Sequence, residues 1–218
     1  MRKLAIFGGT FNPIHCGHLR MAETAFSQFA LDLVIWVPAY HPLHKSSGKL
    51  AAFHHRLNMV QQAIEPYPHF ICSDIESHLP DRTYAIDTFT ALQAHYPESR
   101  WYWLIGVDAF KLLPHWYQSQ NLVPQCCWLI APRLGTGMPE AHCNPFPSSL
   151  ALCEQVAQTL AAKGIHLEWH LLSMPLLEIS SSLIRHYSRD RHPIRHLVPE
   201  AVRAYILEHG LYQEPVGS

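Results

Sequence analysis

The sequence predicts a doubly wound α/β fold, in which helices cover both faces of a mostly parallel sheet and a helical C-terminal part follows. Between Leu4 and Leu172, short apolar runs with the length of buried strands recur, and segments with helical periodicity lie between them. Hydrophobic residues make up 48% of the 218 residues, so a sizeable core is possible. We therefore expect one domain spanning residues 1–218, with its helical C-terminal part at about 179–212.

The first half of the chain alternates strands and helices, as a parallel sheet requires. Buried strands are expected at 4–7 and 33–37, and the second ends at Pro38, which cannot continue a hydrogen-bonded ladder. The helix between them has its apolar positions at Leu19, Ala22, Ala25, Phe26 and Phe29. A polar loop at 39–52 follows, then a helix at 53–64 and a strand near 70–72. The apolar face of that helix holds Leu57, Val60, Ala63 and Ile64.

The second half continues the alternation. Thr83 is expected to be the N-cap of a helix that reaches about Tyr96, because its hydroxyl can accept a free backbone N–H. Strands are expected at 101–105, 127–131 and 167–172. A surface loop at 132–147 leads to a helix at 150–163 that is closed by Gly164. Two C-terminal helices follow, one from about residue 179 and one at 199–208 that ends at Gly210.

A distinctive motif joins the first strand to the first helix. It reads Gly-Gly-Thr-Phe-Asn-Pro from Gly8 onward and continues into His15-Cys-Gly-His18. Glycines let the backbone turn sharply and approach a ligand closely. A helix start favours an anion through its free N–H groups and its dipole. The chain lacks both the G-x-x-x-x-G-K-[ST] loop and the G-x-G-x-x-G fingerprint, so this motif predicts a phosphate site of another type.

A second candidate phosphate motif lies about 160 residues later. Ser180, Ser181 and Arg185 form Ser-Ser-x-x-x-Arg at an expected helix start, directly after Ile179. Hydroxyls, backbone N–H groups and a fixed cation suit a polyphosphate. Asp108 stands just after the fourth strand, at the sheet edge where open α/β sheets bind ligands.

Composition and charge limit the classes of partner and the cellular location that we expect for the protein. The formal net charge is −1, with acidic and basic residues interspersed, so we expect no nucleic-acid partner. The 6 cysteines are scattered, which is typical of free thiols in a reduced compartment. We see neither a signal peptide nor an apolar run long enough for a membrane helix, and we expect a cytoplasmic protein. Despite the 17 histidines, we expect no metal bound by protein ligands alone.

The two phosphate motifs together resemble those of nucleotidyltransferases with a Rossmann-like fold. Over nearly its full length the chain resembles the bacterial nicotinate-nucleotide adenylyltransferases. The segments that carry this resemblance are 8–19, 37–45, 55–59, 83–88, 105–108 with Trp116, 179–185 and 197–212.

The resemblance implies that ATP and nicotinate mononucleotide give deamido-NAD and pyrophosphate, with Mg²⁺ bridging phosphate oxygens. His18 would stabilise the transition state at the α-phosphate, His15 would bind the same polyphosphate, and Ser181 and Arg185 would hold the outer phosphates. The full set implied for ATP is Gly8, Gly9, Thr10, Phe11, His15, His18, Ile179, Ser180, Ser181 and Arg185.

The same resemblance assigns the nicotinate mononucleotide site. Lys45 would hold the attacking phosphate, Asp108 a ribose hydroxyl, and Trp116 would stack on the pyridine ring. The helix start at Thr83, Tyr84 and Ala85 offers N–H groups that suit a carboxylate better than an amide. Two alternatives remain open: transfer to nicotinamide mononucleotide or phosphopantetheine, or a non-catalytic nucleotide sensor on the same fold.

Overall fold

The computed structural model describes residues 1–42, 50–80, 82–132, 146–175 and 178–213. It contains a six-stranded sheet with the strand order β3-β2-β1-β4-β5-β6. Every neighbouring pair of strands is parallel. The strands are β1 (Arg2–Gly9), β2 (Leu33–Pro38), β3 (Phe70–Cys72), β4 (Ser99–Gly106), β5 (Cys126–Ala131) and β6 (Glu168–Leu171).

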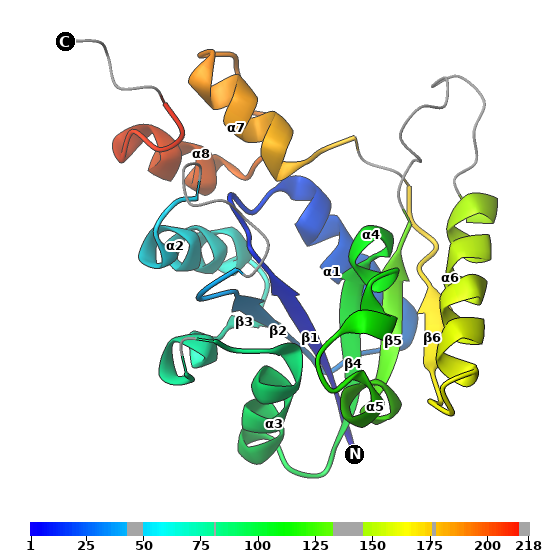
Figure 1. Ribbon diagram of the computed structural model, residues 1–218. Helices are drawn as coiled ribbons and strands as arrows, with labels where there is room; N and C mark the ends of the chain where they lie inside the picture. Colours follow the sequence, from blue (N-terminus) through cyan, green and yellow to red (C-terminus); the bar gives the residue numbers. More distant parts are fainter. Residues whose placement is uncertain (43–49, 81, 133–145, 176–177, 214–218) are drawn as a thin grey trace.

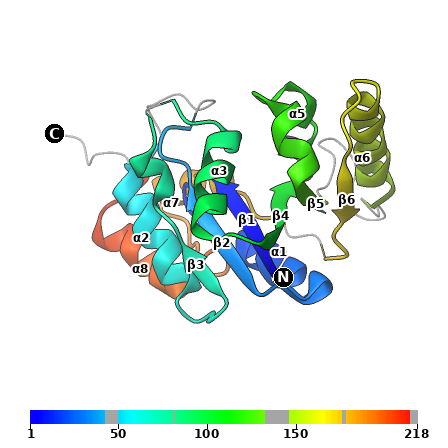
Figure 2. The ribbon, with the colours of Figure 1, turned by 90° about the horizontal axis from the view of Figure 1, so that it is seen from below.

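Helices cover both faces of this sheet (Figure 1; Figure 2). They are α1 (Cys16–Phe29), α2 (Phe53–Ile64), α3 (Ala85–His95), α4 (Val107–Phe110), α5 (Ser119–Leu122), α6 (Phe146–Ala161), α7 (Ser181–Arg189) and α8 (Glu200–Glu208). The described residues also include the 3₁₀ helices η2 (Ile75–His78), η3 (Leu113–His115) and η4 (Val123–Gln125). The doubly wound, parallel α/β fold expected from the sequence is thus confirmed.

The sheet divides the interior into two cores. Successive side chains of a strand point to opposite faces, so Ala5 and Phe7 of β1 enter one core and Leu4 and Ile6 enter the other. The first core also holds buried side chains of α1, α2, α7 and α8. The second holds buried side chains of α3, α4, α5 and α6. Burial on both faces explains why the strands appear in the sequence as continuous apolar runs.

Three element boundaries differ from the expectation. Tyr84, not Thr83, is the N-cap of α3, because the Thr83 hydroxyl instead donates to the Pro80 carbonyl oxygen at 2.6 Å. Helix α6 begins at Phe146 rather than residue 150, since Pro147 falls in the first turn, where a proline needs no N–H partner. On α2, Leu57 is only half-buried, and Arg56 and Met59 are buried instead.

The C-terminal helix α8 is part of the first core. Ile206 of α8 is 1% exposed, whereas the adjacent Leu207 is 53% exposed. We expect Ile206→Ala to lower the free energy of unfolding by about 2–4 kcal/mol, because it removes buried methyl groups and leaves a cavity. Leu207→Ala is the matched control and should change stability by less than about 1 kcal/mol. Urea denaturation measures both; equal effects would show that α8 does not pack as described.

Candidate active site

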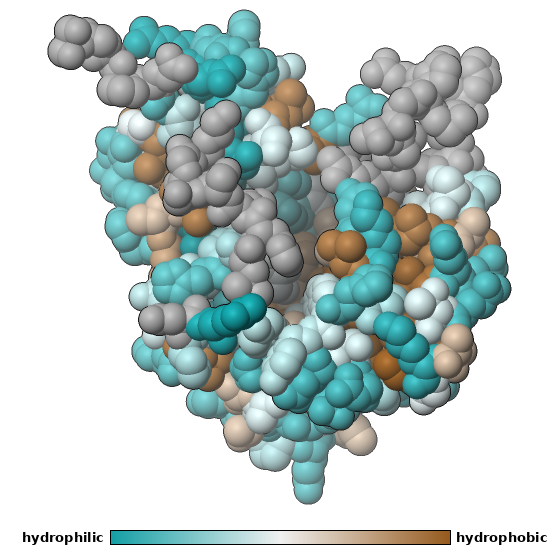
Figure 3. Space-filling view, in the orientation of Figure 1, coloured by the Kyte–Doolittle hydropathy of each residue, from teal (hydrophilic) through white to brown (hydrophobic). Residues whose placement is uncertain are grey.

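The candidate site lies where the strand order of the sheet reverses. β1 and β4 are neighbours, and the chain continues outward from β1 through β2 and from β4 through β5. Ligands of open α/β sheets bind at this point, outside the carboxyl ends of the strands. Here β1 ends at Gly9 and β4 at Gly106. The surface is hollowed between the side that carries α2 and α7 and the side that carries α4 and α5 (Figure 3).

His15 and His18 cap the start of α1 reciprocally. His15 is the N-cap residue, and its Nδ1 accepts the His18 backbone N–H at 3.3 Å. In return, the His18 Nδ1 accepts the His15 backbone N–H at 3.3 Å. The two rings stack with their centroids 3.6 Å apart. Each helix-capping bond therefore also fixes the orientation of an imidazole ring.

This cap also determines which ring nitrogen carries the proton in a neutral imidazole. A nitrogen that accepts a backbone N–H cannot itself carry a proton in that bond, so in a neutral ring the proton is on Nε2. His15 is buried and His18 is half-buried. The arrangement prepares two Nε2–H donors side by side at a helix start, which suits phosphate oxygens.

Two glycines permit the close packing of this motif. A Cβ on Gly17 would lie 3.0 Å from the His15 Nδ1. A Cβ on Gly9 would lie 2.9 Å from the Phe11 ring, and Phe11 itself adopts a positive φ of 46°. The Phe11 ring is buried and meets the His18 ring edge to face, with centroids 5.1 Å apart. The glycines therefore allow both imidazole rings to keep their places.

Helix α7 docks onto the loop between β1 and α1, where the sequence predicted a second phosphate motif. The Ser181 Oγ donates to the Pro13 carbonyl oxygen at 2.9 Å, and the Arg185 Nη1 donates to the Asn12 carbonyl oxygen at 2.8 Å. Ser180 is the N-cap, and its Oγ accepts the Leu183 N–H at 3.1 Å. Ile179 packs near Gly17, since a Cβ on that glycine would lie 3.8 Å from the Ile179 Cβ. The two motifs are thus adjacent.

This docking changes what the motif residues can offer a phosphate. The expectation treated the serine and arginine donors of α7, and the N–H groups at the start of α1, as available to an anion. In the structure, the Ser181 hydroxyl is committed to the loop, and the Cys16 N–H donates to the Leu197 carbonyl oxygen at 2.9 Å. Arg185 also donates through its Nη2 to the Ser182 Oγ at 3.1 Å, and each of its two Nη atoms carries a second N–H. The imidazoles and Arg185 are therefore the candidate donors of the two motifs.

Arg56 is a site residue for which the sequence analysis assigned no role. It is only 1% exposed, yet its guanidinium donates to three backbone carbonyl oxygens, those of Ala51 at 3.0 Å, Thr10 at 2.9 Å and Tyr40 at 3.4 Å. Burial lowers the pKa of Arg56, while the charges of Tyr212 and Glu76 act in the opposite direction. A signal was present in the sequence, since Arg56 falls on the same helical stripe as Val60 and Ala63.

Asn12 and Tyr212 connect the same loop to the C-terminal end of the described chain. The Asn12 Oδ1 accepts the Tyr212 hydroxyl at 2.8 Å and the Ala51 N–H at 3.1 Å. Burial raises the pKa of the Tyr212 hydroxyl, so it remains a donor at neutral pH. The loop is therefore held from both sides, by its carbonyl groups and by the Asn12 side chain.

The start of α3 forms another part of the candidate site. The Tyr84 N–H donates to the Asp87 carboxylate at 2.9 Å, so this N–H is not available to a ligand. No described residue accepts the N–H groups of Ala85 and Ile86. The Tyr84 ring lies against Tyr117, with centroids 4.4 Å apart, and beneath the Arg82 guanidinium. Two free helical N–H groups therefore remain beside an aromatic surface.

Trp116 packs with Trp103 and Trp128, and Trp103 in turn lies close to Gly8 of β1. Its ring centroid lies 6.2 Å from that of Trp103 and 5.8 Å from that of Trp128. A Cβ on Gly8 would lie 3.8 Å from Trp103. Trp116 is partly buried. It lies just outside η3, which ends at His115. Asp108 is exposed in the first turn of α4, and Lys45 lies outside the described residues.

Comparisons with known proteins agree with this arrangement. The cytidylyltransferase-like family matches residues 6–187. A "Probable nicotinate-nucleotide adenylyltransferase" of Trichormus variabilis is 48% identical over 214 residues, which cover 98% of this chain and 99% of the relative. The protein of the same name from Synechococcus sp. (strain JA-3-3Ab) is 42% identical, with coverage of 98% of this chain and 96% of the relative.

Solved structures show the same fold. The nicotinic acid mononucleotide adenylyltransferase of Plasmodium falciparum, complexed with NaAD, aligns with a TM-score of 0.72 at 21% identity, and the alignment covers 97% of this chain and 98% of that one.

None of the described helices is long and apolar enough to cross a membrane.

The three carbonyl contacts of Arg56 predict a strict requirement for its planar, forked side chain. Arg56→Lys keeps the charge but supplies a single nitrogen, which cannot reach all three oxygens. We expect the free energy of unfolding to fall by about 2–3 kcal/mol, since buried carbonyl groups lose their donors. We also expect catalytic efficiency to fall about ten- to a hundredfold, because the loop loses its register.

Arg20→Lys on the exposed surface of α1 is the matched control for this change, since Arg20 is exposed and lies at 3.9 Å from the Glu23 carboxylate. Chemical denaturation and steady-state kinetics on both variants provide the measurement. If Arg56→Lys behaves like Arg20→Lys, Arg56 does not hold the loops.

Proposed function

The chain belongs to the cytidylyltransferase-like family and, within it, to the nicotinate-nucleotide adenylyltransferases, and from this premise we propose how its cleft carries out the reaction. The protein transfers the adenylyl group of ATP to nicotinate mononucleotide in NAD biosynthesis. A phosphate oxygen of the mononucleotide forms a bond with the α-phosphorus, the bond from that phosphorus to the bridging oxygen of pyrophosphate breaks, and the products are nicotinate adenine dinucleotide and pyrophosphate.

The reciprocal cap of His15 and His18 is the observation that carries the assignment of catalytic roles. The attacking phosphate is already anionic near neutral pH, so the protein needs donors for developing charge rather than a general base. We assign the His18 Nε2–H to the α-phosphate oxygens and the His15 Nε2–H to the same polyphosphate. Their Nδ1 atoms, both occupied by backbone N–H groups, hold the rings in place without reorganisation.

The remaining ATP contacts come from the loop and α7. The Gly8–Phe11 backbone would line the polyphosphate, with Ile179 and Ser180 beside it. Arg185 would hold the outer phosphates with its spare N–H groups, and Ser181 acts mainly by fixing α7 on the Pro13 carbonyl oxygen. Arg185 therefore combines a binding role with a positioning role.

A divalent metal accompanies ATP in nucleotidyltransferases of this kind, and we propose Mg²⁺. Neither the loop 8–19 nor the segment 179–185 contains a carboxylate, so these segments offer no hard anionic ligand. The ion would be held by phosphate oxygens and water, and it would neutralise charge on the polyphosphate.

For nicotinate mononucleotide we propose a site that extends from Asp108 to the start of α3. Asp108 would bind a ribose hydroxyl, the partly buried Trp116 would present its ring to the pyridine, and Lys45 would hold the attacking phosphate. Thr83, Tyr84 and Ala85 would receive the carboxylate. The free N–H groups at the start of α3 and the nearby Arg82 guanidinium support this placement.

We also propose that residues 1–218 work as one domain in the cytoplasm. The shared core of β1 with α7 and α8 supports the first part of this proposal. The proposed substrates are small metabolites, which supports the cytoplasmic location.

The proposed catalytic role of His18 can be tested separately from its role in capping α1. In His18→Asn the amide oxygen can replace Nδ1 as acceptor of the His15 N–H, while Nε2 is lost. We expect turnover to fall about 10²–10³-fold, as for loss of one transition-state donor, with stability within about 0.5 kcal/mol of wild type. In His18→Ala we expect the same loss of turnover and about 1 kcal/mol less stability, because the bond from the His15 N–H to the His18 ring, one half of the reciprocal cap, is lost too.

His166→Asn, on an exposed histidine outside the site, is the control. Pyrophosphate release from ATP and nicotinate mononucleotide measures turnover. Wild-type turnover in His18→Asn would exclude His18 from the transition state, and a wild-type protein that releases no pyrophosphate would refute the proposed roles altogether.

The start of α3 predicts selectivity for the acid. A carboxylate accepts the N–H groups of Ala85 and Ile86, whereas the NH₂ of an amide would face these donors. We expect nicotinate mononucleotide to be preferred over nicotinamide mononucleotide by at least about a hundredfold in catalytic efficiency. Parallel kinetics with the two acceptors tests this, and equal efficiencies would show that the helix start does not read the carboxylate.

A further inference from the structure

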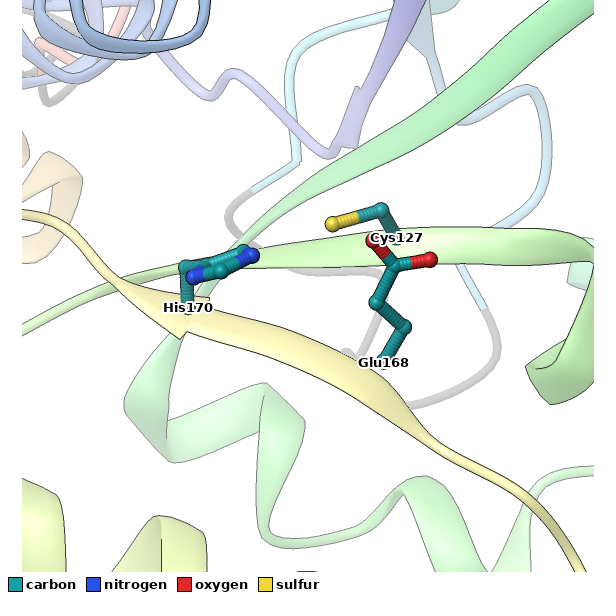
Figure 4. Close-up of side chains that lie close together, drawn as sticks. All are labelled: Cys127, Glu168 and His170. Carbon is teal, nitrogen blue, oxygen red and sulfur yellow. The ribbon is translucent and has the colours of Figure 1, made fainter.

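A cluster of three potential metal ligands lies far from the cleft. The Cys127 Sγ, a Glu168 carboxylate oxygen and a His170 ring nitrogen all lie within 4.8 Å of one another. Figure 4 shows these side chains gathered on one side of β5 and β6. Cys127 and Glu168 lie near the amino ends of β5 and β6, and His170 packs against Phe29 at the C-terminal end of α1, whereas the cleft lies at the carboxyl ends of the strands and the start of α1. From this cluster we propose a binding site for Zn²⁺ or a similar transition-metal ion.

Strand register brings the three side chains together. β5 and β6 are parallel, with Cys127 opposite Glu168 and Leu129 opposite His170. Glu168 and His170 are two residues apart on one strand, so they point to the same face. Cys127 points to that face as well, the one covered by α1. Because hydrogen-bonded strands hold all three Cα positions, the ligand set is built on a rigid frame.

The chemistry of the set favours zinc over hard cations. A thiolate, an imidazole and a carboxylate are the ligand types that zinc takes, whereas Mg²⁺ and Ca²⁺ require oxygen ligands. In a tetrahedral zinc site, bond lengths of about 2.0–2.3 Å place the ligand atoms roughly 3.3–3.8 Å apart. The separations, none above 4.8 Å, would therefore have to shorten by no more than about 1.5 Å, which small χ rotations can supply. Water would take the fourth position, since Glu168 and His170 face solvent.

Neighbouring groups orient these ligands. The Arg100 Nη2 donates to the Glu168 Oε1 at 2.6 Å, which leaves the other carboxylate oxygen for the ion. The His170 ring lies against Phe29 of α1, with centroids 5.1 Å apart. Hydrogen-bonded carboxylates and oriented imidazoles are typical supports of metal ligands. Arg100 also places a positive charge nearby, so it opposes the ion while it orients the carboxylate.

Binding requires the Cys127 thiol to ionise. Burial and the Glu168 carboxylate raise the pKa of Cys127 to about 12, so the free thiol is protonated at neutral pH. On binding, the sulfur–metal bond forms, the S–H bond breaks, and the proton passes to solvent. A dipositive ion stabilises the thiolate directly and opposes the effect of burial.

The test uses the full chain without a histidine tag, stripped with a chelator and kept reduced, and Co²⁺ as the probe. Because a cobalt–thiolate bond produces a near-ultraviolet charge-transfer absorption, this band reports sulfur ligation among the many surface histidines. We expect the band to saturate at one Co²⁺ per chain and to disappear when Zn²⁺ displaces the cobalt. Cys127→Ser should abolish the band, and Cys153→Ser, which alters a buried thiol on the opposite face of the sheet, should retain it.

Two exposed positions keep the proposal testable if Cys127→Ser does not fold. His170→Ala and Glu168→Gln should each weaken Zn²⁺ binding at least about tenfold, and adenylyl transfer should be unchanged, because both residues are remote from the cleft. Cobalt that binds without the thiolate band, a band that survives Cys127→Ser, or wild-type Zn²⁺ affinity in both exposed variants would overturn the proposal.

Discussion

The structure depends on four side-chain donors that hold the loop between β1 and α1. Arg56 donates to the Thr10 carbonyl oxygen, Arg185 to that of Asn12, Ser181 to that of Pro13, and Tyr212 to the Asn12 side chain. A loop that approaches phosphates closely has no ladder to satisfy its carbonyl groups, so donors must come from elsewhere. This constraint explains why a buried arginine donates to backbone carbonyl oxygens and why the chain returns to this loop after α8.

The same contacts make binding and stability inseparable at α7. Its serine and arginine look, in sequence, like ligands for a polyphosphate, yet in the structure they first attach the helix to the loop. The rings of His15 and His18 likewise serve the helix cap through Nδ1, and in the proposed mechanism their Nε2–H groups would bind the polyphosphate. One set of residues thus forms the site and positions it, so preorganisation needs few additional residues.

Fold class, strand positions and the helix starts of the two motifs could be predicted because each has a local signal, such as an apolar run, a glycine pair or a serine before a helix. For Arg56 the sequence indicates burial, through its place on the apolar stripe of α2, but its role could not be predicted, since that role depends on carbonyl groups supplied by separate segments. The start of α3 was placed one residue early, because nothing local shows that the Thr83 hydroxyl turns to Pro80. The neighbours of Cys127 likewise emerge only from the register of β5 and β6.

The bond between Tyr212 and Asn12 joins residues 200 positions apart. During synthesis the glycine-rich loop leaves the ribosome long before its tyrosine exists, and Ser181 and Arg185 also follow it late. Until then the loop lacks three of its four side-chain donors, and Arg56 alone of the four can hold it. The loop is therefore among the first parts of the site to be made and among the last to be fixed in place.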